Sequence, residues 1–251
     1  MSGHSKWSTI KRKKGAADAK RGQLFTRLAR EIVLAARDGG GDPNSNVRLR
    51  LAIDKARANN MPKDNIERAI SRGTGDGKDG NEIEEMTYEG YAPKGVAMMI
   101  SVVTDNRNRA VAELRHILNR QGGALGEGGS VAWQFSRVAS FTLTAEGLDN
   151  DKVFELAVEA GAEDVKFDEE EIEIIGPVES FKAIGDALRR AAIPVEDAGL
   201  KYIPTNEIEL DVEDTLQVLR VIEAVEELDD VQDVFTNLHV SNEALAQLEE
   251  A

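Results

Sequence analysis

The sequence contains no cysteine, and only 3 of its 251 residues are histidine. Without cysteine there is no disulfide, no thiolate nucleophile and no cysteine-ligated zinc or iron–sulfur centre. The histidines, His4, His116 and His239, lie in three distant segments without the paired spacing of a zinc-binding helix, and no serine has the surroundings of a nucleophile elbow. We therefore predict no enzyme activity, no metal site, no cofactor and no small-molecule substrate.

Long apolar runs are also absent. One of the longest, Val96–Val103, is far shorter than the ~20 residues that a membrane-spanning helix needs. Residues 1–21 are rich in charge and lack the apolar core of a secretory signal. We expect a cytoplasmic protein that does not enter a membrane.

Basic residues are in the minority, since 31 Lys and Arg stand against 46 Asp and Glu, for a net charge of −15. The two signs are unevenly distributed. Residues 1–72 hold 17 of the basic and 7 of the acidic residues, which leaves 14 and 39 for the rest of the chain. Binding responds to the local potential within about 8–10 Å. The acidic average therefore does not exclude an amino-terminal segment that binds nucleic acid.

A basic arm, residues 3–21, opens the chain. Seven of its residues are Lys or Arg, Asp18 is its acidic residue, and Trp7 lies among the cations. Such a segment can neutralise several phosphates at once, and a tryptophan can stack on an unpaired base. The candidate nucleic-acid-binding residues of the arm are His4, Lys6, Trp7, Lys11, Arg12, Lys13, Lys14, Lys20 and Arg21.

The same arm has a plainer interpretation. Trp7 can pack against helices of the protein itself while the cations are simply solvated. The sequence leaves both interpretations open.

A second basic cluster follows an expected strand, at Thr104–Arg109. Asp and Asn favour the turn into a helix, and the amino end of a helix attracts anions. Arg107 and Arg109, helped by Arg115 and Arg120, are therefore candidates for a second phosphate or partner contact. The alternative is helix capping with ordinary surface charge.

Three helices are predicted after the arm. The first spans about 22–37, because Leu24, Leu28 and Ile32 recur at helical spacing and glycines 39–41 stop the pattern. The second is capped at residues 44–46 and turns most of its Arg and Lys outward. The third has Pro62 in its first turn and ends at Gly73. These helices predict a small basic helical domain.

The remaining chain alternates strands and helices. We expect strands 86–91, 95–104, 131–135, 140–144, 164–168, 171–175, 195–203, 207–210 and 231–239, and helices 108–120, 149–160, 178–191 and 212–227. From strand 140–144 onward the order is βαββαβ, with Asp168–Glu170 as a central hairpin turn, which is typical of a ferredoxin-like sandwich.

The fold class predicted is α+β with three domains. A basic arm and helical domain covers 1–75. Segment 86–120 lacks strands that the tail supplies, so we expect a discontinuous α/β domain of 76–129 plus 205–251. A ferredoxin-like α/β domain of 130–204 is then inserted between its two parts. We expect the discontinuous α/β domain to be a ferredoxin-like sandwich as well.

Several motifs in this sequence resemble the YebC/PmpR family over the whole chain. The residues that carry the resemblance are Gly3–Trp7, Lys14–Arg21, Phe25, Asn60–Ile70, Tyr88–Val96, Thr104–Arg109, Gly128–Phe135 and Tyr202–Pro204.

The resemblance implies a helical amino-terminal domain and two α/β domains. Some members of the family are described as DNA-binding transcriptional regulators. Others, including a mitochondrial translational activator, act on the ribosome, and bacterial relatives are implicated in relieving stalls at consecutive prolines. The phosphate-binding role carries over best to the arm.

Our first hypothesis for function is a non-enzymatic translation factor that contacts ribosomal RNA or tRNA on the ribosome. The alternative is a transcriptional regulator that binds duplex DNA, although no helix-turn-helix with a clearly basic recognition helix stands out. An acidic protein–protein adaptor is a third hypothesis.

Overall fold

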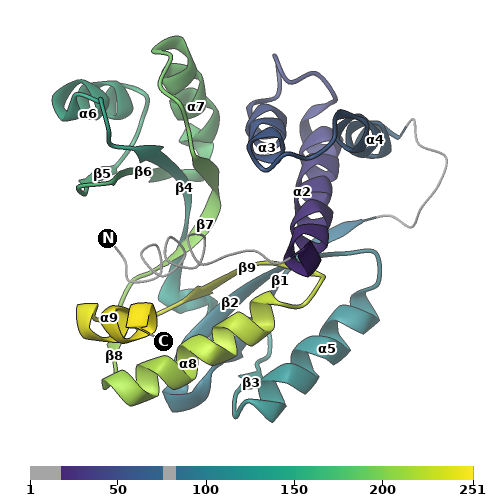
Figure 1. Cartoon of the computed structure of the whole chain (residues 1–251), viewed down its shortest axis with the longest axis vertical. Helices are drawn as coiled ribbons and strands as arrows, with labels where there is room; N and C mark the ends of the chain where they lie inside the picture. The colour runs from purple at the N-terminus through teal and green to yellow at the C-terminus, as the bar shows by residue number, and fades with distance from the viewer. Residues whose placement is uncertain (1–17, 76–82, 251) are drawn as a thin grey trace. The chain divides into compact units, whose positions relative to one another are not determined.

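The computed structural model describes residues 18–75 and 83–250, with side chains for residues 22–75 and 83–247. The described residues form two compact units, each assembled from separate stretches of chain (Figure 1). The first unit contains the described residues up to Arg27, those from Ile83 to Ser136 and those from Tyr202 on. The second contains those from Leu28 to Gly75 and from Arg137 to Lys201. Helices and antiparallel sheets are both present, so the predicted α+β class is confirmed.

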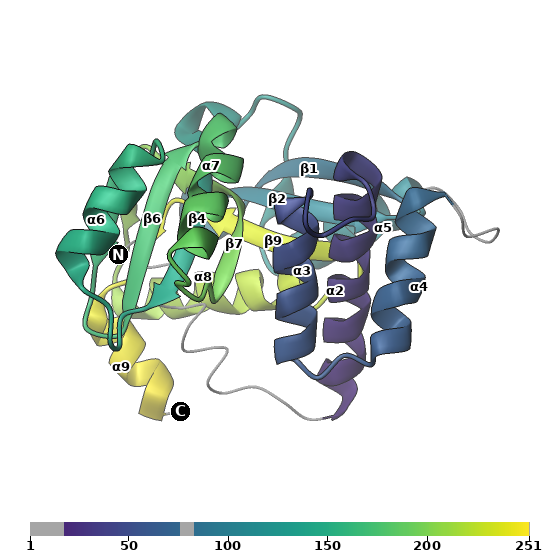
Figure 2. The ribbon, with the colours of Figure 1, turned by 90° about the horizontal axis from the view of Figure 1, so that it is seen from above.

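Three helices, which run side by side in Figure 2, begin the described chain. They are α2 (Asp18–Gly39), α3 (Val47–Ala58) and α4 (Lys63–Thr74). Of the three candidate caps at residues 44–46, Asn46 is the one that caps the second helix, and its side-chain oxygen accepts a hydrogen bond from Leu49 N–H at 3.0 Å. The third helix ends one residue beyond the predicted Gly73, and Gly75 closes it in the left-handed region at φ 83°.

An antiparallel sheet in the order β5-β6-β4-β7 forms the rest of the second unit, continuing at its ends into the first. This is the strand order of a βαββαβ ferredoxin-like sandwich, as predicted. The Asp168–Glu170 turn joins β5 to β6 through a 2.9 Å hydrogen bond from Asp168 N–H to Glu171 O. Alternate residues Ala139, Phe141 and Leu143 face the core beneath α6 and α7. The elements are β4 (Phe135–Thr144), α6 (Asn150–Glu159), β5 (Asp164–Phe167), β6 (Glu171–Pro177), α7 (Phe181–Arg190) and β7 (Asp197–Pro204).

The first unit is built on a second antiparallel sheet in the order β3-β1-β2-β9, with α5 and α8 on one face (Figure 1). Buried Met98, Ile100 and Val102 alternate along β2 toward the helices, whereas Ala97 and Met99 face a smaller core on the other side. The elements are β1 (Glu84–Tyr91), β2 (Ala97–Thr104), α5 (Arg107–Arg120), β3 (Ala124–Leu125), α8 (Val212–Glu226) and β9 (Val231–Thr236).

Strand β9 therefore shares a sheet with β1 and β2, although more than 100 residues separate them in the chain. The four strands occupy the positions of the strands in a ferredoxin-like sandwich, but their order along the chain differs. β1, the first strand of this sheet in the chain, lies where the third strand of a ferredoxin-like sandwich usually lies. The three domain boundaries expected from the sequence stay a prediction.

Three predicted strands differ in the structure. The strand predicted over 231–239 is divided into β9 (Val231–Thr236) and β10 (Leu238–His239), which belong to different sheets. Residues 131–135 are not a strand: Ala132–Gln134 form a 3₁₀ turn and β4 begins at Phe135. Val131 and Phe135 are both buried, and their spacing of four suits a helical turn better than an extended strand. The strand predicted over 207–210 shrinks to β8 (Ile208–Glu209). It pairs in parallel with β10 (Leu238–His239) in a separate two-stranded sheet and does not join β9.

Candidate nucleic-acid interface

Most predicted residues of the arm lie outside the described part of the chain: His4, Lys6, Trp7, Lys11, Arg12, Lys13 and Lys14. Lys20 and Arg21 belong to the first turns of α2, where the backbone alone is described. Their contact with nucleic acid stays a prediction.

The turn before α5 has the predicted capped geometry. β2 ends at Thr104 and α5 begins at Arg107. The Asn106 side-chain oxygen accepts from Arg109 N–H at 3.1 Å, and Asn106 N–H donates to Thr104 Oγ1 at 2.9 Å. The turn thereby fixes where the first two arginines of α5 start.

Arg109 is held by carboxylates of the protein. Its Nη2 lies 2.9 Å from each carboxylate oxygen of Asp230, a residue that is 2% exposed, and 3.0 Å from Asp105 Oδ1. The hydrogen bond to Asp230, opposed by burial and aided by Asp105, raises the pKa of the Arg109 guanidinium. This geometry supports the structural alternative for Arg109, since a phosphate has to compete with two carboxylates for it.

The outward side of α5 is basic. The helix carries four arginines and one acidic residue, Glu113. Arg107, Arg115, His116 and Arg120 are exposed, and within the described residues none of these three arginines forms an ion pair. They can therefore meet phosphates without breaking a contact of the fold.

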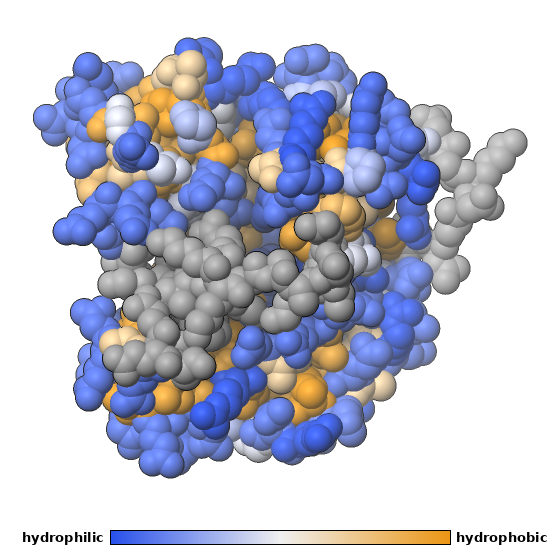
Figure 3. Space-filling view, in the orientation of Figure 1, coloured by the Kyte–Doolittle hydropathy of each residue, from blue (hydrophilic) through white to orange (hydrophobic). Residues whose placement is uncertain are grey.

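Helix α8 lies beside α5 on the same face of the sheet and has the opposite charge (Figure 1). It contains Glu213, Asp214, Glu223 and Glu226 against one basic residue, Arg220. Figure 3 shows mostly hydrophilic residues over this region, with apolar residues between them. The carboxylates of α8 repel a polyanion, so on this face of the sheet the surface that favours one is that of α5.

Several cations of the helical segment, predicted to face outward, are instead engaged within the second unit. Arg50 Nη2 lies 3.7 Å from Asp186 Oδ1 on α7, and Lys55 Nζ lies 2.8 Å from Asp197 Oδ1 on β7. Helical periodicity predicts which residues of α3 point away from the core of the three helices. It does not show that α7 and β7 cover this side of α3. The pairs Arg48–Asp38, Arg57–Asp54 and Lys63–Glu67 lie nearer the solvent.

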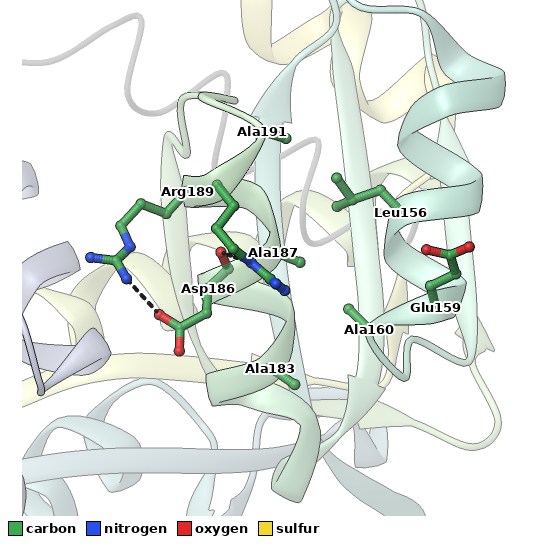
Figure 4. A pocket seen from close by; sticks show the side chains of 9 residues that line it. Leu156, Glu159, Ala160, Ala183, Asp186, Ala187, Arg189 and Ala191 are labelled. Carbon is green, nitrogen blue, oxygen red and sulfur yellow. Dashed lines mark hydrogen bonds and ion pairs between the residues drawn. The ribbon is translucent and has the colours of Figure 1, made fainter.

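A shallow groove of about 840 Å³, which was not predicted from the sequence, runs between α6 and α7 (Figure 4). Its floor is mainly small and apolar, with Ala183 and Ala187 one helical turn apart on α7. At its edge Arg189 pairs with Asp186 at 3.5 Å. Arg190 also donates a hydrogen bond to Asp186, to its carbonyl oxygen, so both arginines at the groove are engaged with one residue of α7.

The described residues contain neither a candidate metal site nor a membrane-spanning helix. No group of three or more His, Asp or Glu residues there is arranged to hold a metal ion. No helix among them is long and apolar enough to cross a membrane.

Comparison with known proteins gives consistent matches along the chain. Residues 5–76 match the TACO1/YebC protein N-terminal domain, and residues 83–238 match the TACO1/YebC second and third domain. A probable transcriptional regulatory protein of Chlorobaculum parvum is 51% identical over 251 residues, all of both chains. One of Rubrobacter xylanophilus is 50% identical over 248 residues, 99% of each.

A solved structure agrees with these matches. A conserved hypothetical protein from Aquifex aeolicus superposes with a TM-score of 0.81 at 42% identity, covering 91% of this chain and 94% of that one. With two family models spanning most of its residues and relatives at half identity over their full length, this chain belongs to the TACO1/YebC family.

Proposed function

We propose that this protein is a non-enzymatic regulator of gene expression that binds nucleic acid, and that its ligand is ribosomal RNA or tRNA on the ribosome. The observation that carries the proposal is the set of three exposed arginines on α5, Arg107, Arg115 and Arg120, with which no carboxylate of the described residues forms an ion pair. The seven Lys and Arg of the basic arm, residues 3–21, add to this support. Phosphate contacts of this kind position a ligand without reading its sequence.

The helical segment offers a specific reason to favour RNA over duplex DNA. Four residues separate α3 from α4, which is the connection length of a helix-turn-helix. In that motif the amino-terminal residues of the second helix approach the bases. Here Asp64 and Glu67 are exposed at that end of α4, and Lys63 is paired with Glu67, so this end has no net positive charge to meet DNA phosphates. This helix pair is therefore poorly suited to enter a major groove.

A regulator without catalytic groups acts by holding its ligand in place. Bound to ribosomal RNA or to the end of a tRNA, the protein would restrict the reacting groups to a productive geometry. Such positioning lowers the entropic part of a barrier and requires no side-chain chemistry. A slow step, such as peptide-bond formation at consecutive prolines, would gain most from it.

A second candidate function is transcriptional regulation through duplex DNA. The observation that favours it is the printed name of the curated relatives, probable transcriptional regulatory protein. Both candidates require nucleic-acid binding, so the ligand decides between them.

The test compares ligands and variants of the full chain. Wild-type protein is titrated with purified ribosomes, ribosomal RNA and duplex DNA at several salt concentrations. Replacing Arg107, Arg115 and Arg120 by Gln should weaken RNA binding and flatten its salt dependence by roughly 0.7 per lost phosphate contact. Tighter binding of a defined DNA site in the presence of competitor RNA would reverse the order of the two candidates.

A matched control removes the same charge elsewhere. Arg57, Lys63 and Lys152 are also exposed cations, but each pairs with a carboxylate three or four residues away on its own helix or at its start. Replacing these three by Gln should leave RNA binding close to wild type. Equal losses in both triple variants would mean that net charge, and not α5, governs binding.

A further inference from the structure

Trp133 is the most exposed large apolar side chain in the described part of the chain, at 73%. The other exposed large apolar residues are Leu24, Phe154, Val158 and Phe167, at 37–48%. An indole left in water forgoes the burial that usually stabilises a tryptophan. Neither the fold nor the function proposed above makes use of this side chain.

The loop that carries Trp133 is clamped by Glu89 of β1. The two carboxylate oxygens of Glu89 accept three backbone hydrogen bonds, from Gly129 N–H at 2.6 Å, Val131 N–H at 2.7 Å and Ala132 N–H at 2.8 Å. Burial raises the pKa of Glu89, but these three donors together outweigh it and hold the pKa below its ordinary value. The carboxylate therefore fixes the backbone immediately before the exposed ring.

The ring itself is also held. Trp133 Nε1–H donates to Ser130 O at 3.1 Å, and the same carbonyl accepts from the Tyr91 hydroxyl at 3.0 Å. On either side in the chain, Val131 and Phe135 are buried in the smaller core of the first unit. The anchored neighbours of Trp133 thus hold its ring in an exposed position. The side chain is already ordered in the free protein, so the entropic cost of ordering it does not weaken ligand binding.

These contacts determine what the ring can bind. The indole N–H, which at protein interfaces usually finds a partner on the other protein, is satisfied by the chain's own carbonyl. What remains is the flat aromatic face, which suits stacking. Gly128 and Gly129 precede it, and the position where either would carry a Cβ is open, so a sugar–phosphate chain can approach the backbone closely.

The loop is connected to α5 through ordered structure. Leu125 of β3 pairs with Gly90 of β1, next to Glu89, and β3 packs against α5. The exposed ring and the basic helix therefore belong to one compact unit. Val131 and Phe135, beside the ring, pack on the face of the sheet opposite α5, so a single strand whose phosphates lie on α5 reaches the ring by passing over the sheet edge at β3.

We propose that Trp133 is a stacking site for an unpaired base of single-stranded RNA, and that Glu89 is the positioning residue that presents it. The inference rests on the proposed function and adds a base contact to its phosphate contacts. Stacking tolerates any base, which suits a factor that recognises position on the ribosome.

The first experiment measures the ring directly. Trp7 is replaced by Phe so that Trp133 is the one tryptophan of the full chain, and its fluorescence is followed during titration with single-stranded oligoadenylate. We expect saturable quenching by oligoadenylate and none by a fully paired RNA duplex. Quenching by an arginine-rich peptide in place of oligoadenylate would overturn the inference, because the face would then serve a cationic protein segment.

The second experiment uses variants of the otherwise unchanged chain. Trp133→Ala should bind oligoadenylate on the order of tenfold to a hundredfold more weakly, with an unchanged salt slope because no phosphate contact is lost. Trp133→Phe should recover part of this loss, since it keeps a flat ring, and it also serves if the alanine variant folds poorly. Phe154→Ala, which removes another exposed aromatic residue, should bind like wild type.

Glu89→Gln tests the positioning role. It keeps the shape of the side chain but weakens the three hydrogen bonds, so affinity for oligoadenylate should fall while the salt slope stays. In the Trp133→Ala background the same substitution should change affinity no further. An additional loss there would contradict a role that acts through the ring.

These outcomes distinguish a failure of the proposed stacking site from a failure of the proposed function. If Trp133→Ala binds oligoadenylate like wild type while the α5 triple variant binds weakly, this inference is wrong and the proposed function stands. If wild-type protein binds no RNA of any kind, both are wrong.

Discussion

Arg109 and Asp230 form a two-pronged ion pair that joins the start of α5 to the residue before β9. The guanidinium donates from Nε and Nη2 to the two carboxylate oxygens at 2.9–3.0 Å, while Thr104 Oγ1 donates to the same carboxylate at 3.0 Å. The backbone of Asp230 leads directly into β9, and its carbonyl oxygen accepts a hydrogen bond from Val103 N–H of β2 at 2.8 Å. The second basic cluster thus contains one structural arginine next to exposed ones.

Arg109→Ala should therefore cost stability, by about 1–3 kcal/mol, because it leaves a buried carboxylate without its main charged partner. Arg107→Ala should leave the unfolding free energy within about 0.5 kcal/mol of wild type, since its side chain is exposed. Urea unfolding of both variants measures the difference. Equal stability of the two variants would contradict the division of roles within the cluster.

Gly73 lies where α4 meets α2. A Cβ on it would fall 2.4 Å from Val33 O and 2.7 Å from Ala36 Cβ, distances that real contacts do not reach. Gly73→Ala should therefore destabilise the protein by about 1–3 kcal/mol as the helices separate. Thermal and urea unfolding check this.

Gly22→Ala is its control, because that position on α2 is exposed and has open space around it. There the substitution should stabilise the helix by roughly 0.5–1 kcal/mol. If both substitutions raised the unfolding free energy, the close packing of α4 on α2 would be disproved.

Asp197 gives the second unit a pH dependence. Burial raises the pKa of this carboxyl, but the ammonium groups of Lys55 and Lys201, at 2.8 and 3.2 Å, outweigh burial and hold the pKa below its ordinary value. A depressed folded pKa stabilises the fold above the unfolded pKa near 3.9, and this stabilisation is lost as the pH falls through the folded pKa.

Asp197→Asn should accordingly lower the unfolding free energy at pH 7 by about 1–3 kcal/mol. The gap to wild type should shrink as the pH falls below about 4, because wild type loses a contribution there that the variant lacks. Urea unfolding at neutral and acidic pH measures the gap. A gap that stays constant down to pH 3 would rule out the assignment to this carboxylate.

Patterns within short stretches of sequence predicted the helices and strands well where the two sides of a helix or strand differ in polarity. Asn46 capped its helix as expected, and the Asp168–Glu170 turn fell between β5 and β6. Where burial came from a distant segment, local periodicity misled. Val131 and Phe135 are both apolar because they pack in the smaller core with Ala97 and Met99 of β2, and the mostly apolar run 131–135 imitated a strand.

The candidate site was predictable only in part. Charge counts located the basic residues, but they did not show that Arg109 and Lys55 are committed to Asp230 and Asp197. Those partners lie 121 and 142 residues away in the chain, beyond the reach of helical spacing. The exposure of Trp133 was equally hidden, because a tryptophan in a mostly apolar run such as 131–135 usually indicates a core.

The most direct measurement of the central claim is crosslinking of the full chain to nucleic acid in living cells, followed by sequencing of what is bound. The account predicts enrichment of ribosomal RNA or tRNA, reduced in the variant with Arg107, Arg115 and Arg120 replaced by Gln and retained in the Arg57, Lys63 and Lys152 control. Enrichment of promoter DNA, with ribosomal RNA and tRNA at background, would contradict it.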